Sequence, residues 1–122
     1  MAKSVTIIED EPFIVEALTF LLEREGLRVS SFNDGAGSVA FIQKTKPDLV
    51  ILDLMLPNVS GMKILEDIRG SENLADLPVL MLTAKGQKKD RAAAETAGAS
   101  QFMTKPFANS ELVESVLNLL KS

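Results

Sequence analysis

The sequence contains neither cysteine nor histidine. Without cysteine there is no disulfide bond, no thiolate nucleophile and no thiolate zinc site. Without histidine the chain lacks the commonest general base and another frequent metal ligand. Any chemistry that it performs must therefore come from carboxylates, hydroxyl groups and lysine.

Clustered positive charge and long apolar runs are also lacking. The formal net charge is −4, and no basic cluster of the kind that neutralises nucleic acid phosphates is present. No apolar stretch approaches the roughly 20 residues of a membrane-spanning helix. We therefore expect a soluble, cytoplasmic protein without direct nucleic acid or membrane contacts. Its 122 residues fit a single domain, 1–122.

Short apolar runs recur along the chain and predict five strands. Three of them, Val5–Ile8, Leu49–Leu52 and Val79–Leu82, are almost continuously apolar, which is typical of parallel strands covered on both faces. The other two, Leu27–Phe32 and Gln101–Met103, carry more polar residues and are predicted to be edge strands.

Segments with helical spacing lie between these strands. The clearest is Pro12–Glu25, which follows a run of acids and ends before Gly26. Further helices are predicted over Gly35–Thr45, Ser60–Arg69, Gln87–Ala97 and Asn109–Leu120. The alanine-rich fourth helix buries little area, so we expect it to be held weakly. This alternation predicts an α/β fold with a doubly wound parallel sheet.

Polar residues follow four of the predicted strands, at the edge where parallel sheets place their ligand sites. They are Glu9, Asp10 and Glu11 after the first strand, Asp53 after the third, Thr83 after the fourth, and Lys105 with Pro106 after the fifth.

Each of these residues also has a purely structural explanation. The acids before Pro12 can cap the first helix, and an aspartate after a strand, such as Asp53, is commonly a turn residue. Thr83 can be an ordinary strand residue, and Lys105 can be a solvated surface lysine. The sequence also permits a cis bond before Pro106, which would aim Lys105 over the sheet edge.

As a set, these residues indicate phosphoryl chemistry. Glu9, Asp10 and Asp53 would repel one another unless a cation joined them, and Mg²⁺ suits carboxylate oxygens that share its shell with phosphate. Lys105 supplies a positive charge and Thr83 a hydroxyl, which both suit phosphoryl oxygens. The expected reaction is phosphoryl transfer to a carboxylate, promoted by positioning and charge neutralisation.

Several motifs occur in a fixed order along the chain. They are Ile7-Ile8-Glu9-Asp10-Glu11-Pro12, Pro47–Pro57, Ser60-Gly61, Leu82-Thr83-Ala84, Gly98-Ala99 and Lys105-Pro106-Phe107. In this order they resemble the receiver domain of bacterial two-component response regulators, over the full length of the chain. The resemblance implies a flavodoxin-like fold with the sheet order 2-1-3-4-5.

The resemblance also implies a phosphorylation site and its metal. Asp53 is the implied phosphoacceptor, and Mg²⁺ the implied cofactor, bound by Asp10, Asp53 and the backbone carbonyl of Met55, with Glu9 acting through water. The implied donor is a phosphohistidine on a histidine kinase or phosphotransfer protein, because this chain has no histidine. The domain would assist its own phosphorylation and dephosphorylation without being an enzyme for further substrates.

By the same resemblance, Thr83 and Lys105 bind the phosphoryl oxygens. Thr83 moves inward, Phe102 turns into the space that it leaves, and the surface of the fourth helix, fifth strand and fifth helix changes. Met55 and Lys85 tune the lifetime of the phosphorylated state. The implied output is a downstream effector protein or a C-terminal output domain beyond this chain, and the implied state is a monomer or a phosphorylation-dependent homodimer.

Some residues depart from one branch of that family. Receivers that drive winged-helix transcription factors often dimerise through this surface with paired charges, and Arg91 with Glu111 can form one such pair. However, Ser100-Gln101 replaces the expected acidic pair, and Ser115 replaces an expected arginine. Phe102 lacks the tyrosine hydroxyl common in that branch. These replacements weaken the case for that dimer.

Three alternatives compete with a phosphorylated receiver. A phosphatase of the haloacid dehalogenase type needs a second acid two residues after its nucleophile, where this chain has Met55. A flavodoxin-like nucleotide or flavin binder needs a glycine-rich or hydroxyl-rich loop after the first strand, where this chain has acids. A receiver that signals by binding alone does not need the complete set of site residues found here.

Overall fold

The computed structural model of the chain describes residues 2–84 and 88–121, so Lys85 and Gln87 lie outside the described residues. Strands and helices alternate. The strands are β1 (Ser4–Ile8), β2 (Arg28–Phe32), β3 (Leu49–Leu52), β4 (Val79–Thr83) and β5 (Gln101–Thr104). The helices are α1 (Pro12–Glu23), α2 (Ser38–Thr45), α3 (Gly61–Gly70), α4 (Lys88–Thr96) and α5 (Asn109–Lys121). None of the described helices combines the length and the apolar character needed to cross a bilayer.

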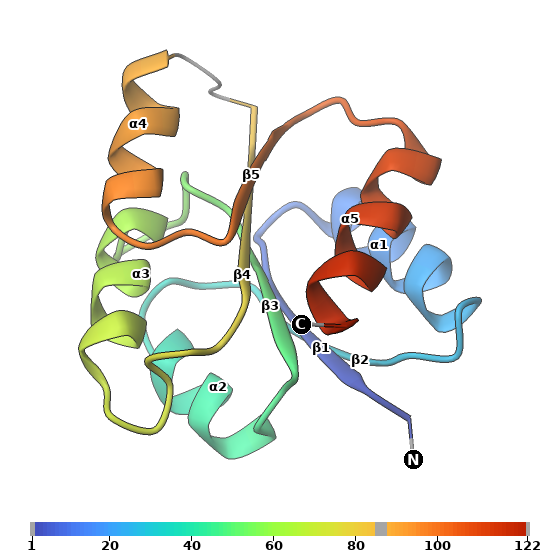
Figure 1. The fold of residues 1–122 in the computed structure, drawn as a ribbon, viewed down its shortest axis with the longest axis horizontal. Coiled ribbons are helices and arrows are strands. Elements are labelled where there is room, and N and C mark those ends of the chain that lie inside the picture. Colours follow the sequence, from blue (N-terminus) through green and yellow to red (C-terminus); the bar gives the residue numbers. More distant parts are fainter. Residues whose placement is uncertain (1, 85–87, 122) are drawn as a thin grey trace.

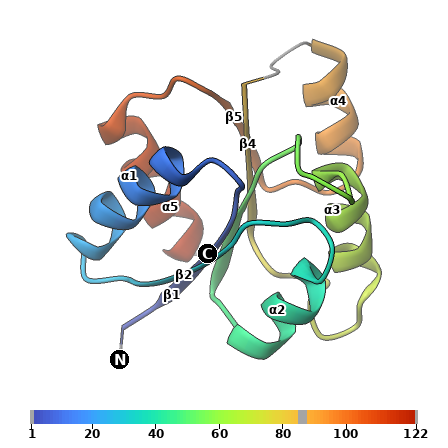
Figure 2. The same cartoon turned by 180° about the vertical axis from the view of Figure 1, so that it is seen from behind.

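The described strands form one parallel sheet with the order β2-β1-β3-β4-β5. Helices α1 and α5 cover one face, and α2, α3 and α4 cover the other (Figure 1). The central strands run upward in both overall views, so their carboxyl ends face the same edge of the sheet (Figure 2). The predicted doubly wound fold and its strand order are confirmed.

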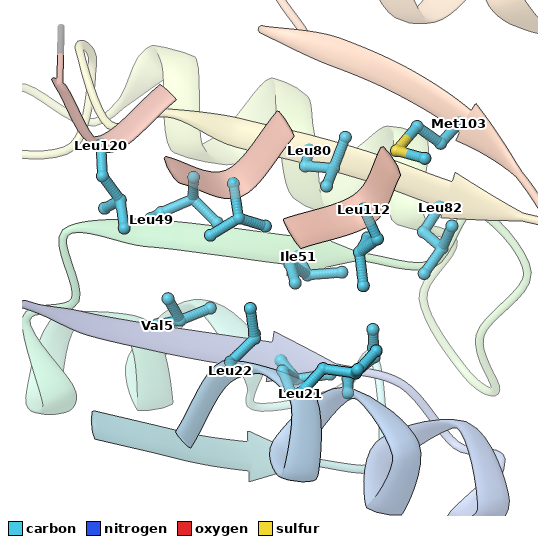
Figure 3. Packing of buried hydrophobic residues seen from close by; sticks show 13 residues of the cluster. Val5, Leu21, Leu22, Leu49, Ile51, Leu80, Leu82, Met103, Leu112 and Leu120 are labelled. Atoms are coloured by element: carbon cyan, nitrogen blue, oxygen red, sulfur yellow. The ribbon is translucent and has the colours of Figure 1, made fainter. Parts of the chain in front are cut away.

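Side chains of the central strands alternate between two hydrophobic cores. In β3, Leu49 and Ile51 belong to the core under α1 and α5, whereas Val50 and Leu52 belong to the core on the opposite face. Figure 3 shows the first core, where Leu112 of α5 lies over the sheet. Covered faces on both sides explain why the central strands are almost continuously apolar.

Two helix boundaries in the described residues differ from the prediction by more than one residue. Helix α1 ends at Glu23 rather than Glu25, because the chain turns before Gly26, whose φ of 83° is left-handed. Helix α2 begins at Ser38 rather than Gly35, after Gly37, which is also left-handed. Apolar periodicity cannot locate such turns, because the residues at a helix end are polar whether or not they are helical.

Helix α4 is held lightly, as predicted. Among its described residues, only Ala94 is buried. A methyl group removes little apolar area from water, so the free energy that fixes α4 to the sheet is small. Among the described helices, α4 therefore has the fewest buried residues to anchor it.

Candidate functional site

Backbone hydrogen bonds extend the sheet by one residue at its carboxyl edge. The N–H of Glu9 donates to the carbonyl oxygen of the last residue of β2 at 3.0 Å. The N–H of Asp53 donates to the carbonyl oxygen of the last residue of β1, also at 3.0 Å. The N–H of Lys105 donates to the last residue of β4 at 2.9 Å. These bonds fix Glu9, Asp53 and Lys105 at one edge of the sheet.

Glu9, Asp10 and Asp53 form the predicted carboxylate cluster. One carboxylate oxygen of each lies within 4.8 Å of the others. Glu9 and Asp53 are buried, at 2% and 4% exposed, whereas Asp10 is exposed. Oxygen ligands at this spacing fit a hard divalent cation that keeps part of its water shell.

The ammonium group of Lys105 lies inside this cluster. Its Nζ is 2.6 Å from Glu9 Oε1, 3.2 Å from Glu11 Oε1 and 3.3 Å from Asp53 Oδ2. The side chain is only 8% exposed, so its interpretation as a solvated surface lysine is wrong. The bond between Lys105 and Pro106 is cis.

Burial and charge shift the pKa values of this buried pair. Burial raises the pKa of Glu9 to about 7 and the charge on Asp53 adds to the effect, whereas hydrogen bonds from Lys105 and the N–H of Glu11 oppose it. Burial by itself would lower the pKa of Lys105, but its hydrogen bond to Glu9 and the charge on Asp53 outweigh burial and raise it. Lys105 is therefore positively charged at neutral pH and offsets part of the negative charge of the cluster.

Glu11 does not cap α1. It occupies the N-cap position, but its side chain makes no capping hydrogen bond. Its Oε1 pairs with Lys105 instead, and its N–H donates to Glu9 Oε2 at 3.1 Å. The capping explanation is therefore wrong for Glu11.

Asp53 has the turn role that the sequence allowed, in addition to its place in the cluster. Its Oδ1 accepts a hydrogen bond from the N–H of Met55 at 3.1 Å, while its Oδ2 faces Lys105. The chain then returns so close that any side chain at Gly61 would collide with the carbonyl oxygen of Asp53. The side chain of Met55 is 56% exposed. The loop after β3 is thus closely fixed around a solvent-facing methionine.

A second loop braces the loop after β3, and sequence reasoning missed it. Asn58 donates to the carboxylate of Asp34, and the N–H of Gly35 donates to the carbonyl of Pro57 at 3.1 Å. We call these four residues the loop brace. A side chain at Gly35 would collide with the carbonyl of Val59. In the sequence these residues resemble ordinary turn formers, and the Asp-Gly pair was the one available signal.

Thr83 and Phe102 lie on the sheet face that α4 covers. Val79, Met81 and Phe102 belong to the core on that face, and Thr83 continues the same alternation along β4. Both Thr83 and Phe102 are buried. The guanidinium carbon of Arg91 lies 5.2 Å from the centre of the Phe102 ring. The ring is already inside the protein, although the resemblance implies that it turns inward only after phosphorylation.

The residues that depart from the charged dimer pattern bond within the chain. Gln101 Nε2 donates to Ser115 Oγ at 2.9 Å and joins β5 to α5. Ser100 Oγ accepts from the N–H of Val79 at 3.0 Å. These polar groups are therefore satisfied without a second copy of the chain.

Comparison of the sequence with known proteins identifies relatives along almost all of the chain. The family model of the response regulator receiver domain matches residues 5–117. The chain is 38% identical over 121 residues to the regulatory protein VanRc of Enterococcus gallinarum, covering 99% of this chain and 51% of the relative. It is 35% identical over 121 residues to the phosphate regulon transcriptional regulatory protein PhoB of Escherichia coli, covering 99% of this chain and 53% of that relative. The chain thus spans about half the length of the curated relatives it matches.

Solved structures are similar over the whole fold. The receiver domain of RstA from Klebsiella pneumoniae, activated with BeF3, has a TM-score of 0.92 and 26% identity, with 98% of this chain and 100% of that chain covered. The receiver domain of the sensor histidine kinase PA1611 from Pseudomonas aeruginosa has a TM-score of 0.90 and 27% identity, with both chains fully covered. That structure has a magnesium ion coordinated in its active site cleft.

Proposed function

Because this chain belongs to the family of response regulator receiver domains, we propose that it is a phosphorylation-dependent signalling switch with Asp53 as its phosphoacceptor. The observation that carries this assignment is the environment of the Asp53 carboxylate. It is buried after a central strand, contacts Lys105, and shares a cluster with two other acids. A carboxylate held beside a cation at the carboxyl edge of a parallel sheet is well placed to act as a nucleophile.

The donor set at this edge fits Mg²⁺. In our proposal, Asp10, Asp53 and the backbone carbonyl of Met55 hold the ion, and Glu9 contributes through water. The preference of Mg²⁺ for oxygen ligands and the magnesium ion in the PA1611 receiver support this choice. When bound, Mg²⁺ neutralises charge on the group that is transferred.

Phosphoryl transfer then follows from the positions of the side chains. Asp53 attacks the phosphorus of a phosphohistidine on a histidine kinase or phosphotransfer protein. A P–O bond forms while the P–N bond breaks, and the electron pair leaves with the imidazole. Lys105 and the hydroxyl of Thr83 each donate to a phosphoryl oxygen. The acyl phosphate carries about one more negative charge than the carboxylate that it replaces.

Hydrolysis resets the switch. Water attacks the phosphorus, the bond to Asp53 breaks, and inorganic phosphate leaves. In our proposal, Met55 and Lys85 tune its rate. A methionine cannot protonate a leaving group, so we do not expect the protein to hydrolyse other phosphate esters.

The output of the switch is a change in the surface formed by α4, β5 and α5. Thr83 is drawn toward the phosphoryl oxygens, and the contacts of Phe102 and Arg91 rearrange with it. Helix α4 responds because Ala94 is its one buried anchor among the described residues. The changed surface is recognised by a downstream effector, or by an output domain such as the remaining half of the longer relatives would provide.

Incubation with acetyl phosphate and Mg²⁺, followed by intact-mass measurement, tests this function. We expect one phosphoryl adduct on the wild-type protein and none on Asp53→Asn. Asp48→Asn, at the other end of β3, is the matched control and should be modified like the wild type. An unmodified wild type, or an adduct that survives Asp53→Asn, would contradict the proposal.

A further inference from the structure

Lys105 has as many carboxylate partners as it has N–H donors. An ammonium group donates three hydrogen bonds, and Nζ lies within 3.3 Å of carboxylate oxygens of Glu9, Glu11 and Asp53. In the proposed function, a phosphoryl group is added to Asp53 and extends beyond its Oδ2. The donor that now faces Oδ2 must then reach the more distant phosphoryl oxygens, so Nζ has to move and its contacts with the two glutamates change.

Breaking the contact with Lys105 would cost more free energy at Glu9 than at Glu11. Glu9 is buried and lies 2.6 Å from Nζ, so its carboxyl oxygen would lose a hydrogen-bond donor without gaining water. The side chain of Glu11 is 59% exposed and lies 3.2 Å from Nζ. Water can replace Lys105 around Glu11, and Glu11 has no capping bond that would hold it in place. Glu11 is therefore the partner that is easier to displace.

We propose that Glu11 is a positioning residue that competes with the phosphoryl oxygens for Lys105. This inference rests on the proposed function. In the unmodified protein, Glu11 draws the ammonium group toward the start of α1. Phosphorylation draws Nζ toward the new oxygens and away from Glu11, whose carboxylate is released into solvent. The strength of the Glu11 contact therefore sets how readily the phosphorylated arrangement forms.

Binding of beryllofluoride in the presence of Mg²⁺ measures this competition without catalytic turnover. We expect Glu11→Gln to tighten beryllofluoride binding by about two- to fivefold, the range that an exposed ion pair supports. Glu11→Asp keeps the charge but shortens the side chain by one methylene, so it should weaken the contact and also tighten binding. Glu23→Gln makes the same charge change at the other end of α1 and should leave binding unchanged.

A second measurement follows the contact itself in metal-free protein. The nitrogen-15 signal of the Lys105 ammonium should shift in both Glu11 variants, because one of its three partners is lost or withdrawn. It should stay in place in Glu23→Gln. This readout depends on neither phosphorylation nor metal.

The outcomes separate this inference from the function on which it rests. Tighter binding in both Glu11 variants, with a shifted Lys105 signal, supports the competition. If only Glu11→Gln binds beryllofluoride more tightly, the effect comes from the negative charge of Glu11 and not from its contact with Lys105. That result overturns the inference. Unchanged binding in both variants also overturns it. A wild-type protein that does not bind beryllofluoride would instead refute the proposed function, and the inference with it.

Discussion

Asn58 donates two hydrogen bonds from Nδ2 to the carboxylate of Asp34, at 3.0 and 2.9 Å. Asp34 also accepts a bond from the N–H of Ala36 at 2.8 Å, and these bonds lower the pKa of Asp34. The contact joins the loop after β2 to the loop after β3. It therefore steadies the segment that begins with Asp53 and Met55.

We predict that loosening the loop brace weakens Mg²⁺ binding. Asn58→Gly removes the amide, and glycine accepts the φ of 69° at this position without strain. Loss of a contact that orients a metal ligand directly commonly lowers metal affinity about 10- to 100-fold. The loop brace holds the loop that carries the ligands and not a ligand itself, so we expect a smaller loss, of about two- to tenfold. Titration calorimetry is the suitable measurement, because the protein has no tryptophan whose fluorescence could report binding. Asp48→Asn should bind Mg²⁺ like the wild type, and equal affinity in Asn58→Gly would contradict the prediction.

We predict that Met55→Asn shortens the lifetime of the phosphorylated state severalfold. Met55 lies two residues beyond Asp53 with its side chain in solvent, where an apolar group keeps water from the acyl phosphate. An amide at the same place can bind and guide water. Loss of phosphate from purified, phosphorylated protein, followed by mass spectrometry, measures the lifetime. Met55→Leu is the matched apolar control, and an unchanged or longer lifetime in Met55→Asn would refute the assignment.

We predict that the metal-free protein becomes less stable as the pH rises from about 4.5 to about 7. Burial raises the pKa of Glu9 from 4.5 to about 7, so the folded state holds a proton that the unfolded state releases. This contribution is complete below about pH 4.5 and is lost by about pH 7, with a size on the order of 3 kcal/mol.

Glu9→Gln isolates this contribution. Urea unfolding followed by circular dichroism, with a metal chelator present, gives the free energy of unfolding of both proteins across this pH range. The stability difference between them should change with pH, because the other acids are common to both. Mg²⁺ favours the ionised carboxylate and should reduce the change. A stability difference that stays constant across the range would show that Glu9 does not titrate there.

We predict that the apolar residues of α1 differ sharply in their contribution to stability. Leu22 is fully buried against the sheet, so Leu22→Ala should cost about 2–5 kcal/mol in the free energy of unfolding. Phe13 is 84% exposed, so Phe13→Ala should change stability by no more than about 0.5 kcal/mol. Urea unfolding of both variants measures the contrast. Similar losses in the two variants would mean that α1 packs differently.

Much of the fold could be predicted because its local patterns and its tertiary packing agree. The run from Leu49 to Leu52 is apolar at every position. In the sheet, successive residues of this run point alternately into one core and into the other. The helix ends could not be predicted as well. The chain leaves or enters the helical conformation near Gly26 and Gly37, which have left-handed backbone angles. The spacing of apolar residues contains no information about backbone angles.

The candidate site was predictable as a set but not as a network. Glu9, Asp53 and Lys105 each follow a strand, and parallel strands bring such residues to one edge. The same rule contains no information about which oxygen pairs with which donor. The alternatives for Lys105 and Glu11 were therefore decided by contacts that a linear pattern does not contain.

By itself, the sequence determined the alternation of strands and helices, because that alternation follows from local apolar periodicity. It also determined the parallel sheet and the edge at which acids, threonine and lysine gather, because the connections between parallel strands obey a general rule. Only the tertiary structure decided that Glu11 pairs with a lysine 94 positions away, and that Asn58 holds Asp34 across two loops. Such contacts depend on how separate loops pack over the finished sheet. Short-range composition does not specify distances between them.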